Sequence, residues 1–157
     1  MARSAPLSGR SIIVADTGAL YALMDASDAW HDDIVAWWSN DPHGLRDIRV
    51  PVTVLPELSY LLATRISPDA EITFAAAVVA GEFILEPLDD DDVVRSAEIM
   101  RQYRDLPLGF VDASLVAIAE RLDAREILTT DRRHFRVVRP QHVRSLALVP
   151  SQPGHQR

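Results

Sequence analysis

The stretch IIVADTGALYAL (residues 12–23) joins an apolar run to a single carboxylate and then to a second apolar segment. The run predicts a buried strand over residues 11–15, and the second segment predicts a helix over residues 17–24. Asp16 lies where the strand ends. It can cap the helix, bind a metal ion, or do both, since a cap uses only some of the lone pairs of a carboxylate.

The rest of the chain repeats this alternation of short apolar runs and amphipathic helical stretches. Further strands are expected at residues 47–50, 83–85 and 127–129. Further helices are expected at residues 29–40, 53–66, 68–79, 93–103 and 112–122, with a short element within 134–138. Strands separated by helices predict βαβ crossovers, and hence an α/β fold: a three-layer sandwich with a mainly parallel central sheet flanked by helices.

The composition is that of a globular protein with one core. The 157 residues are 48 % hydrophobic and 25 % charged, and no linker or internal repeat divides them. The absence of cysteine excludes disulfides, thiolate metal sites and cysteine nucleophiles. The N-terminal residues lack the apolar core of a signal peptide, and no apolar stretch reaches the roughly 20 residues that span a bilayer. We therefore expect a cytoplasmic protein without a membrane partner.

Charge is distributed unevenly along the chain, whose formal net charge is −7. Residues 1–120 contain 8 arginines and 20 acidic residues, whereas residues 121–157 contain 8 arginines and 3 acidic residues. A globally acidic surface repels nucleic acid, but a basic segment can hold a phosphate backbone, so RNA or DNA binding is confined to a patch. The chain contains no lysine. This argues against phosphoacceptor domains and aspartyl-nucleophile phosphatases, because both use a lysine at the phosphoryl group.

Three aspartates lie where ligands bind in such folds, beyond the carboxyl ends of strands or at the start of a helix. Asp16 and Asp131 each follow an expected strand, and Asp112 opens an expected helix. For each of the three, N-capping of a helix, worth about 1 kcal/mol, is an alternative explanation.

Glu57 is harder to explain as a cap. It shares the helical spacing of Val54, Leu58 and Leu61, which predicts that it faces inward. A carboxylate that faces the core is costly unless a buried arginine or a metal ion meets it. Four acids near one end of a sheet would repel one another, and a divalent ion would resolve this repulsion. Ligands that are all oxygens favour Mg²⁺ or Mn²⁺, which can activate water and stabilise charge on a phosphoryl group.

Four blocks together resemble the PIN domain family, and within it the VapC-type toxins of bacterial toxin–antitoxin modules. The blocks are VADTGALYAL, VTVLPELSYLL, YRDLPLGFVDASLVAIAERL and EILTTDRRHF, and the resemblance runs over about residues 12–140. Each block carries one of the family's acids: Asp16, Glu57, Asp112 and Asp131. A single PIN-like domain is therefore expected over residues 11–149, with an N-terminal extension over 1–10 and a flexible tail over 150–157.

The resemblance implies a metal-dependent endoribonuclease that cleaves RNA phosphodiester bonds as the toxin of a type II toxin–antitoxin pair. Asp16 and Asp112 would hold Mg²⁺, with Mn²⁺ as a substitute, and Glu57 and Asp131 would bind a second ion or orient the attacking water. The expected partners are RNA, a cognate antitoxin whose C-terminal segment lies across the active site, and a second copy in a homodimer. The alternative is a catalytically silent PIN-like protein that binds RNA or a partner.

Other polar and aromatic residues receive structural or surface roles. Residues 89–92 are expected to interact with the dipole of the helix that follows, and His134 is expected to be structural or at the surface. Helical spacing predicts core or dimer packing for Trp30, Trp37 and Trp38. Three arginines after the fourth acid are explained equally well as a surface turn or as contacts to the RNA backbone: Arg132, Arg133 and Arg136.

Overall fold

The computed structural model describes residues 9–151, and its centre is a sheet of five strands. The strands lie in the order β3-β2-β1-β4-β5, and all four pairings between neighbours are parallel. Their bounds are Ser11–Ala15 (β1), Arg46–Pro51 (β2), Ile84–Glu86 (β3), Glu126–Leu128 (β4) and Ala147–Val149 (β5). The expected mainly parallel sheet is therefore confirmed. Most of the expected extension and tail falls on residues 1–8 and 152–157, which lie outside the described residues.

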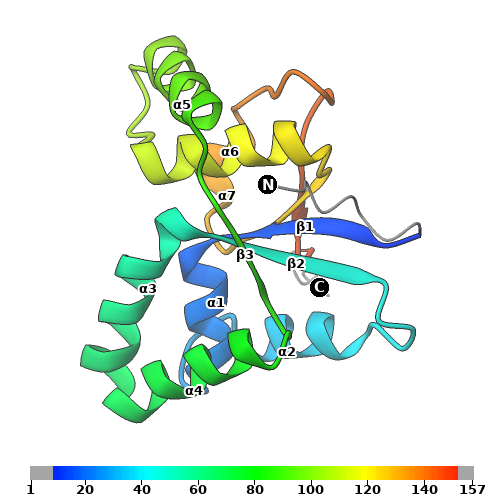
Figure 1. Cartoon of the computed structure of the whole chain (residues 1–157), viewed down its shortest axis with the longest axis vertical. Helices are drawn as coiled ribbons and strands as arrows, with labels where there is room; N and C mark the ends of the chain where they lie inside the picture. The colour runs from blue at the N-terminus through cyan, green and yellow to red at the C-terminus, as the bar shows by residue number, and fades with distance from the viewer. Residues whose placement is uncertain (1–8, 152–157) are drawn as a thin grey trace, which may run out of the picture.

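Helices cover both faces of the sheet and complete the expected three layers (Figure 1). The helices are Thr17–Met24 (α1), His31–Ser39 (α2), Leu55–Leu61 (α3), Pro68–Val79 (α4), Asp90–Gln102 (α5), Phe110–Leu122 (α6) and Arg132–Phe135 (α7). In Figure 1, α1 to α4 lie on one side of the sheet, and α5 and α6 lie on the other. No helix within residues 9–151 has the length and apolarity needed to cross a membrane.

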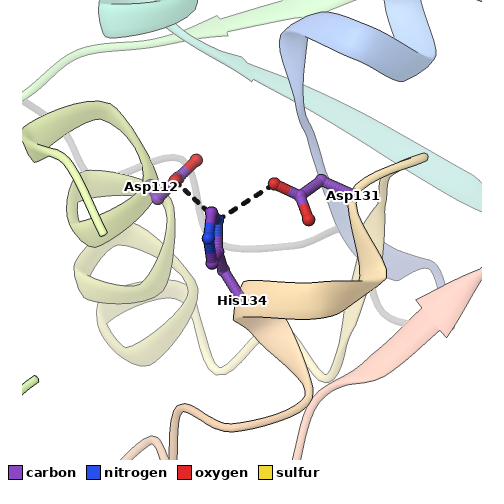
Figure 2. A group of neighbouring side chains, drawn as sticks. All are labelled: Asp112, Asp131 and His134. Carbon is purple, nitrogen blue, oxygen red and sulfur yellow. Dashed lines mark ion pairs between the residues drawn. The ribbon is translucent and has the colours of Figure 1, made fainter. Parts of the chain in front are cut away.

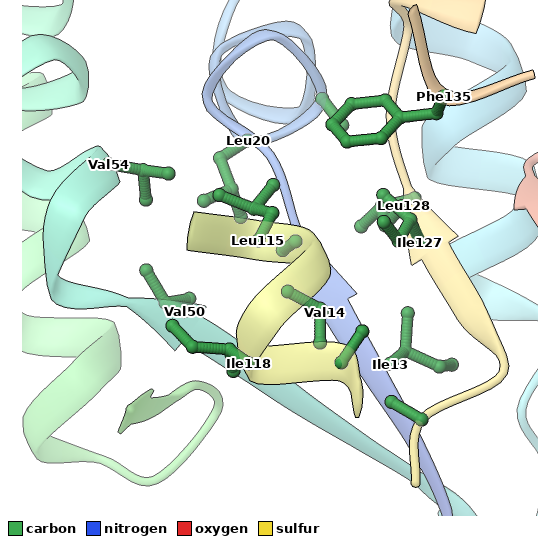
Figure 3. Close-up of a cluster of buried hydrophobic side chains, with 14 of the residues drawn as sticks. Ile13, Val14, Leu20, Val50, Val54, Leu115, Ile118, Ile127, Leu128 and Phe135 are labelled. Carbon is green, nitrogen blue, oxygen red and sulfur yellow. The ribbon is translucent and has the colours of Figure 1, made fainter. Parts of the chain in front are cut away.

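The core lies on both sides of β1, the central strand. The last four residues of β1 are buried, as their apolar character predicts, and α6 packs on β1 and β2. Figure 3 shows Leu115 and Ile118 of α6 grouped with Val14 and Val50 of these strands. All seven residues of α6 from Ala113 to Ala119 are buried. The first turn of α6, which carries Asp112, is therefore followed directly by a segment anchored in the core.

The chain between β2 and α4 differs most from expectation. One helix over residues 53–66 is predicted. The structure instead forms a 3₁₀ turn, Val52–Val54 (η1), then α3, then a π-helical turn, Leu62–Ile66 (η2). Thr53 lies inside η1, where its hydroxyl hydrogen-bonds with the hydroxyl of Ser114 at 2.8 Å. This threonine therefore ties the chain after β2 to α6 and does not cap a helix.

Three smaller differences occur in the second half of the chain. The helix expected to open at Asp112 begins two residues earlier, with Gly109 at its N-cap. The short element expected within residues 134–138 is α7, which begins at Arg132. The strand β5 is not predicted, because three apolar residues at the edge of a sheet carry too little periodicity to be recognised.

Two expectations about other side chains are confirmed. Asp89 and Asp92 form a capping box at the start of α5, so the acidic run stabilises a helix N-terminus. Trp37 and Trp38 pack against the core, and the ring of Trp38 lies 5.2 Å from the ring of Phe83, centroid to centroid.

Candidate active site

Asp16 leaves the sheet at the carboxyl end of β1, where short hydrogen bonds hold its carboxylate. One oxygen accepts the N–H of Thr17 at 2.7 Å, and the other accepts the hydroxyl of Thr129 at 2.9 Å. Thr129 directly follows β4, which pairs with β1, and its hydroxyl oxygen also accepts the N–H of Asp131 at 2.9 Å. Asp16 therefore caps α1 and faces the site at once, and one threonine links two of the predicted acids.

Asp112 and Glu57 extend from two different helices, α6 and α3, toward the site that Asp16 faces. Asp112 is the third residue of α6, so N-capping does not explain it. Glu57 lies in the first turn of α3 and accepts the hydroxyl of Thr17, whose oxygen lies 3.3 Å from Oε2.

The inward orientation predicted for Glu57 is wrong. The buried stripe of this segment runs through Val54, Leu58 and Leu62, and Glu57 lies beside it with its side chain exposed. Within residues 9–151 no arginine comes within ion-pair distance of Glu57, so the buried salt bridge considered as an alternative does not form.

The four predicted acids all line one cleft of about 370 Å³, at the carboxyl ends of β1 and β4. Its other lining residues are Thr17, Gly18, Tyr21, Asp28, Trp30, Leu61, Arg65 and Thr130. Among residues 9–151, five carboxylates therefore share this cleft with one arginine. Such an excess of negative charge favours the binding of cations.

Burial and mutual repulsion perturb two of these carboxylates. Burial, followed by the charge of Asp112, raises the pKa of Asp16 to about 6, although the hydrogen bonds from Thr129 and Thr17 lower it. The pKa of Asp112 is also raised, first by burial and then by the charge of Asp131, while His134 opposes this rise. A cation at these carboxylates would favour their ionised forms.

His134, which is expected to be structural or at the surface, lies beside two of the predicted acids. Its Nδ1 lies 3.1 Å from Oδ2 of Asp131 and 3.6 Å from Oδ2 of Asp112. Figure 2 shows the imidazole between the two carboxylates, one from α6 and one from the turn that opens α7. The signal that could have found this residue is its spacing of three from Asp131, which places both side chains on one side of a helical turn.

Gly18 is a second residue that the sequence analysis missed. A Cβ at this position would lie 2.6 Å from the hydroxyl oxygen of Thr130, closer than real contacts allow. A larger residue at this position would force the hydroxyl of Thr130 to move. The two strand ends carrying Asp16 and Asp131 meet at this contact.

Two arginines lie at or near the cleft, one lining it directly and the other stacked on one of its aromatic residues. Arg65 lies in the π-helical turn η2, is exposed, and lines the cleft. Arg132 stacks over the ring of Trp30 at 5.3 Å, and its Nε and one terminal nitrogen are buried without a hydrogen-bond partner. The predicted contacts of Arg132, Arg133 and Arg136 with RNA stay a prediction.

The sequence profile of the PIN domain matches residues 13–140. The chain belongs to the PIN domain family. This PIN chain is 34 % identical over 128 residues to Ribonuclease VapC26 of Mycobacterium tuberculosis, covering 82 % of this chain and 93 % of that protein. The resemblance indicated by the four sequence blocks is therefore confirmed.

Solved VapC and VapBC structures share the fold. VapC20 of Mycobacterium tuberculosis, described as a sarcin-ricin loop cleaving toxin, has a TM-score of 0.72 at 24 % identity, over 84 % of this chain and 98 % of that one. VapBC2 of Rickettsia felis, solved bound to a DNA fragment from its promoter, has a TM-score of 0.61 at 15 % identity, over 87 % of this chain and 96 % of that one. At these identities the likeness concerns the fold alone.

Proposed function

We propose that this PIN-domain protein is a metal-dependent endoribonuclease and the toxin of a type II toxin–antitoxin pair. The observation that carries the proposal is the gathering of Asp16, Glu57, Asp112 and Asp131, from four separate elements, in one cleft. The similarity to a protein named as a ribonuclease supports RNA as the substrate.

The donor set fits a divalent cation. The four acids supply oxygen ligands, and Asp16 and Asp112 have raised pKa values because each is buried near another carboxylate. In our proposal Asp16 and Asp112 hold Mg²⁺, with Mn²⁺ as a substitute, and Glu57 and Asp131 complete the site. The bound ion supplies Lewis-acid stabilisation of the charge that develops on a phosphoryl group.

The chain's own residues hold these ligands and receive the substrate. Thr129 and Thr17 fix the two oxygens of Asp16, so its carboxylate is oriented before any ion arrives. Arg65 is the arginine that lines the cleft, and we assign it a contact with an RNA phosphate beside the scissile bond.

A cognate antitoxin, a second copy in a homodimer and a cytoplasmic site of action are part of the same proposal. The solved VapBC structures of similar fold support the antitoxin partner. A catalytically silent RNA-binding protein is the weaker alternative, because an acidic cleft repels RNA unless a cation is bound within it.

The direct test is cleavage of RNA by purified protein with Mg²⁺ or Mn²⁺. Chelation by EDTA and the substitution Asp112→Asn should each abolish cleavage, with the circular dichroism spectrum unchanged. Asp69→Asn is the matched control, because Asp69 also lies in the first turn of a helix but is exposed on α4. Cleavage that survives both chelation and Asp112→Asn would refute the proposal.

A further inference from the structure

The position of His134 carries an inference beyond the four acids. Both of its ring nitrogens are buried, and neither has a hydrogen-bond partner. Yet Nδ1 lies 3.1 Å from Oδ2 of Asp131 and 3.6 Å from Oδ2 of Asp112 (Figure 2). The shorter contact is within hydrogen-bond distance but lacks the alignment that a hydrogen bond requires.

The shorter distance, 3.1 Å, is close to that between neighbouring ligands around a small cation. Two ligand atoms about 2.1 Å from an octahedral ion lie about 3.0 Å apart when adjacent and about 4.2 Å apart when opposite. The two contacts of Nδ1 fall within this span. One ligand atom from each of Asp112, Asp131 and His134 lies within 4.8 Å of the other two, so the three side chains form a group that could hold a metal ion.

We infer that His134 is a nitrogen ligand, through Nδ1, of a divalent cation that it shares with Asp112 and Asp131. This inference deepens the proposed function and rests on its metal-holding cleft. It also changes the expected ion. Imidazole suits divalent transition metals better than Mg²⁺, which prefers oxygen ligands. A mixed nitrogen and oxygen set therefore favours an ion such as Mn²⁺ over Mg²⁺.

The competing explanation is that His134 is a fixed positive charge that neutralises two carboxylates without touching a metal. In that case a ring N–H would be expected to donate a hydrogen bond to Asp131 or Asp112. Neither contact has the alignment that such a bond requires. Among residues 9–151, His134 is the histidine that joins this group of possible ligands, so a nitrogen signal from the metal can be traced to it.

The test is electron spin echo envelope modulation of the full-length protein loaded with Mn²⁺. We expect modulation from a coordinated ¹⁴N of imidazole in the wild type, replaced by a ¹⁵N pattern in uniformly ¹⁵N-labelled protein. His134→Gln should lose this modulation and still bind Mn²⁺. His43→Gln is the control, because His43 is exposed on the loop before β2, and it should keep the modulation.

Isothermal titration gives a second measurement on the same variants. His134→Gln should weaken Mn²⁺ binding by at least about tenfold, the loss that even an outer partner of a metal ligand typically causes. Its Mg²⁺ affinity should change much less, so the preference for Mn²⁺ over Mg²⁺ should shrink. An unchanged preference in a variant with the wild-type circular dichroism spectrum overturns the inference.

The two proposals can fail separately. Mn²⁺-loaded wild type without nitrogen modulation overturns the role of His134, and RNA cleavage that EDTA abolishes would still uphold the nuclease. Nitrogen modulation in a protein that cleaves no RNA supports His134 as a ligand and refutes the proposed activity. The wild-type spectrum is decisive even if His134→Gln does not fold.

Discussion

The hydroxyl of Thr129 donates to Oδ2 of Asp16 at 2.9 Å, across the pair of strands β1 and β4. The same hydroxyl oxygen accepts the backbone N–H of Asp131 at 2.9 Å. Thr129 is fully buried, so water cannot replace either bond. One side chain thus sets the position of a buried carboxylate and the direction in which the chain leaves β4.

Replacing Thr129 by valine keeps the shape of the side chain and removes both hydrogen bonds. We expect a loss of about 1–3 kcal/mol in the free energy of unfolding, because buried polar groups lose their partners. Mg²⁺ affinity should fall by about 10- to 100-fold, since a residue that orients a metal ligand is lost. Urea unfolding and isothermal titration measure the two effects.

Thr73→Val provides the control for Thr129→Val. The hydroxyl of Thr73 is exposed and bonds only to the carbonyl of Asp69 one turn earlier in α4. Its removal should change stability by less than about 0.5 kcal/mol. Equal effects of the two substitutions on Mg²⁺ affinity would show that Thr129 does not position Asp16.

The pKa of Asp16 makes the stability of the metal-free protein depend on pH. The pKa rises from an ordinary value of 3.8 to about 6 on folding, so the folded state binds this proton more tightly than the unfolded state. Protonated Asp16 stabilises the fold fully below pH 3.8, and this stabilisation is lost as the pH rises through about 6. The loss amounts to about 3 kcal/mol.

Unfolding in urea at pH 5 and pH 7.5 measures this dependence. Without metal, Asp16→Asn should flatten the slope, because asparagine does not titrate. Added Mg²⁺ should stabilise the wild type more at pH 7.5 than at pH 5, since protons compete with the ion for Asp16. A larger stabilisation by Mg²⁺ at pH 5 would contradict this assignment.

Gly18→Ala should have opposite effects in two backgrounds. In the wild type the new Cβ would lie 2.6 Å from the hydroxyl oxygen of Thr130, so we expect a loss of about 1–3 kcal/mol. In a Thr130→Ala background that clash is absent, and alanine in a helix should stabilise the protein by about 1 kcal/mol. A double-mutant cycle from urea unfolding gives both values. If Gly18→Ala changes the free energy of unfolding in the same direction in both backgrounds, the contact with Thr130 is not the reason that position 18 is glycine.

Arg65→Gln should weaken RNA binding without changing the chemical step. We expect KM to rise with kcat unchanged, and the salt dependence of RNA binding to fall by about one unit of slope, because one phosphate contact is lost. The control is Arg101→Gln, which removes an exposed arginine from the last turn of α5. Identical salt slopes for the Arg65 variant and the wild type would exclude the contact.

The sequence predicted the parts of the site that depend on local pattern. Asp16 was predicted as a site residue because it comes directly after a buried strand. Asp131 was predicted for the same reason, since it comes just after the strand β4. Parallel strands bring such carboxyl ends to one edge of the sheet. Asp112 was found at the start of an expected helix and Glu57 from its helical spacing, and the family resemblance joined all four acids in one site.

What the sequence did not reveal depends on packing between distant segments. His134 and Asp112 are 22 positions apart in the sequence, and they come into contact only because α7 packs beside α6. Arg65 lies in the cleft on a π-helical turn, which no hydrophobic period predicts. Glu57 was placed on the wrong face because helical spacing alone does not locate the edge of a buried stripe.

The complete burial of α6 from Ala113 to Ala119 has a consequence for genetics. If the protein arrests growth as a toxin, selection for survivors should return substitutions in this buried segment as often as substitutions of the acids. Bulky or polar replacements there would displace Asp112 by disturbing the core that anchors it. Such survivors would produce little folded protein, and immunoblotting would separate them from mutants that accumulate normally but have lost their chemistry.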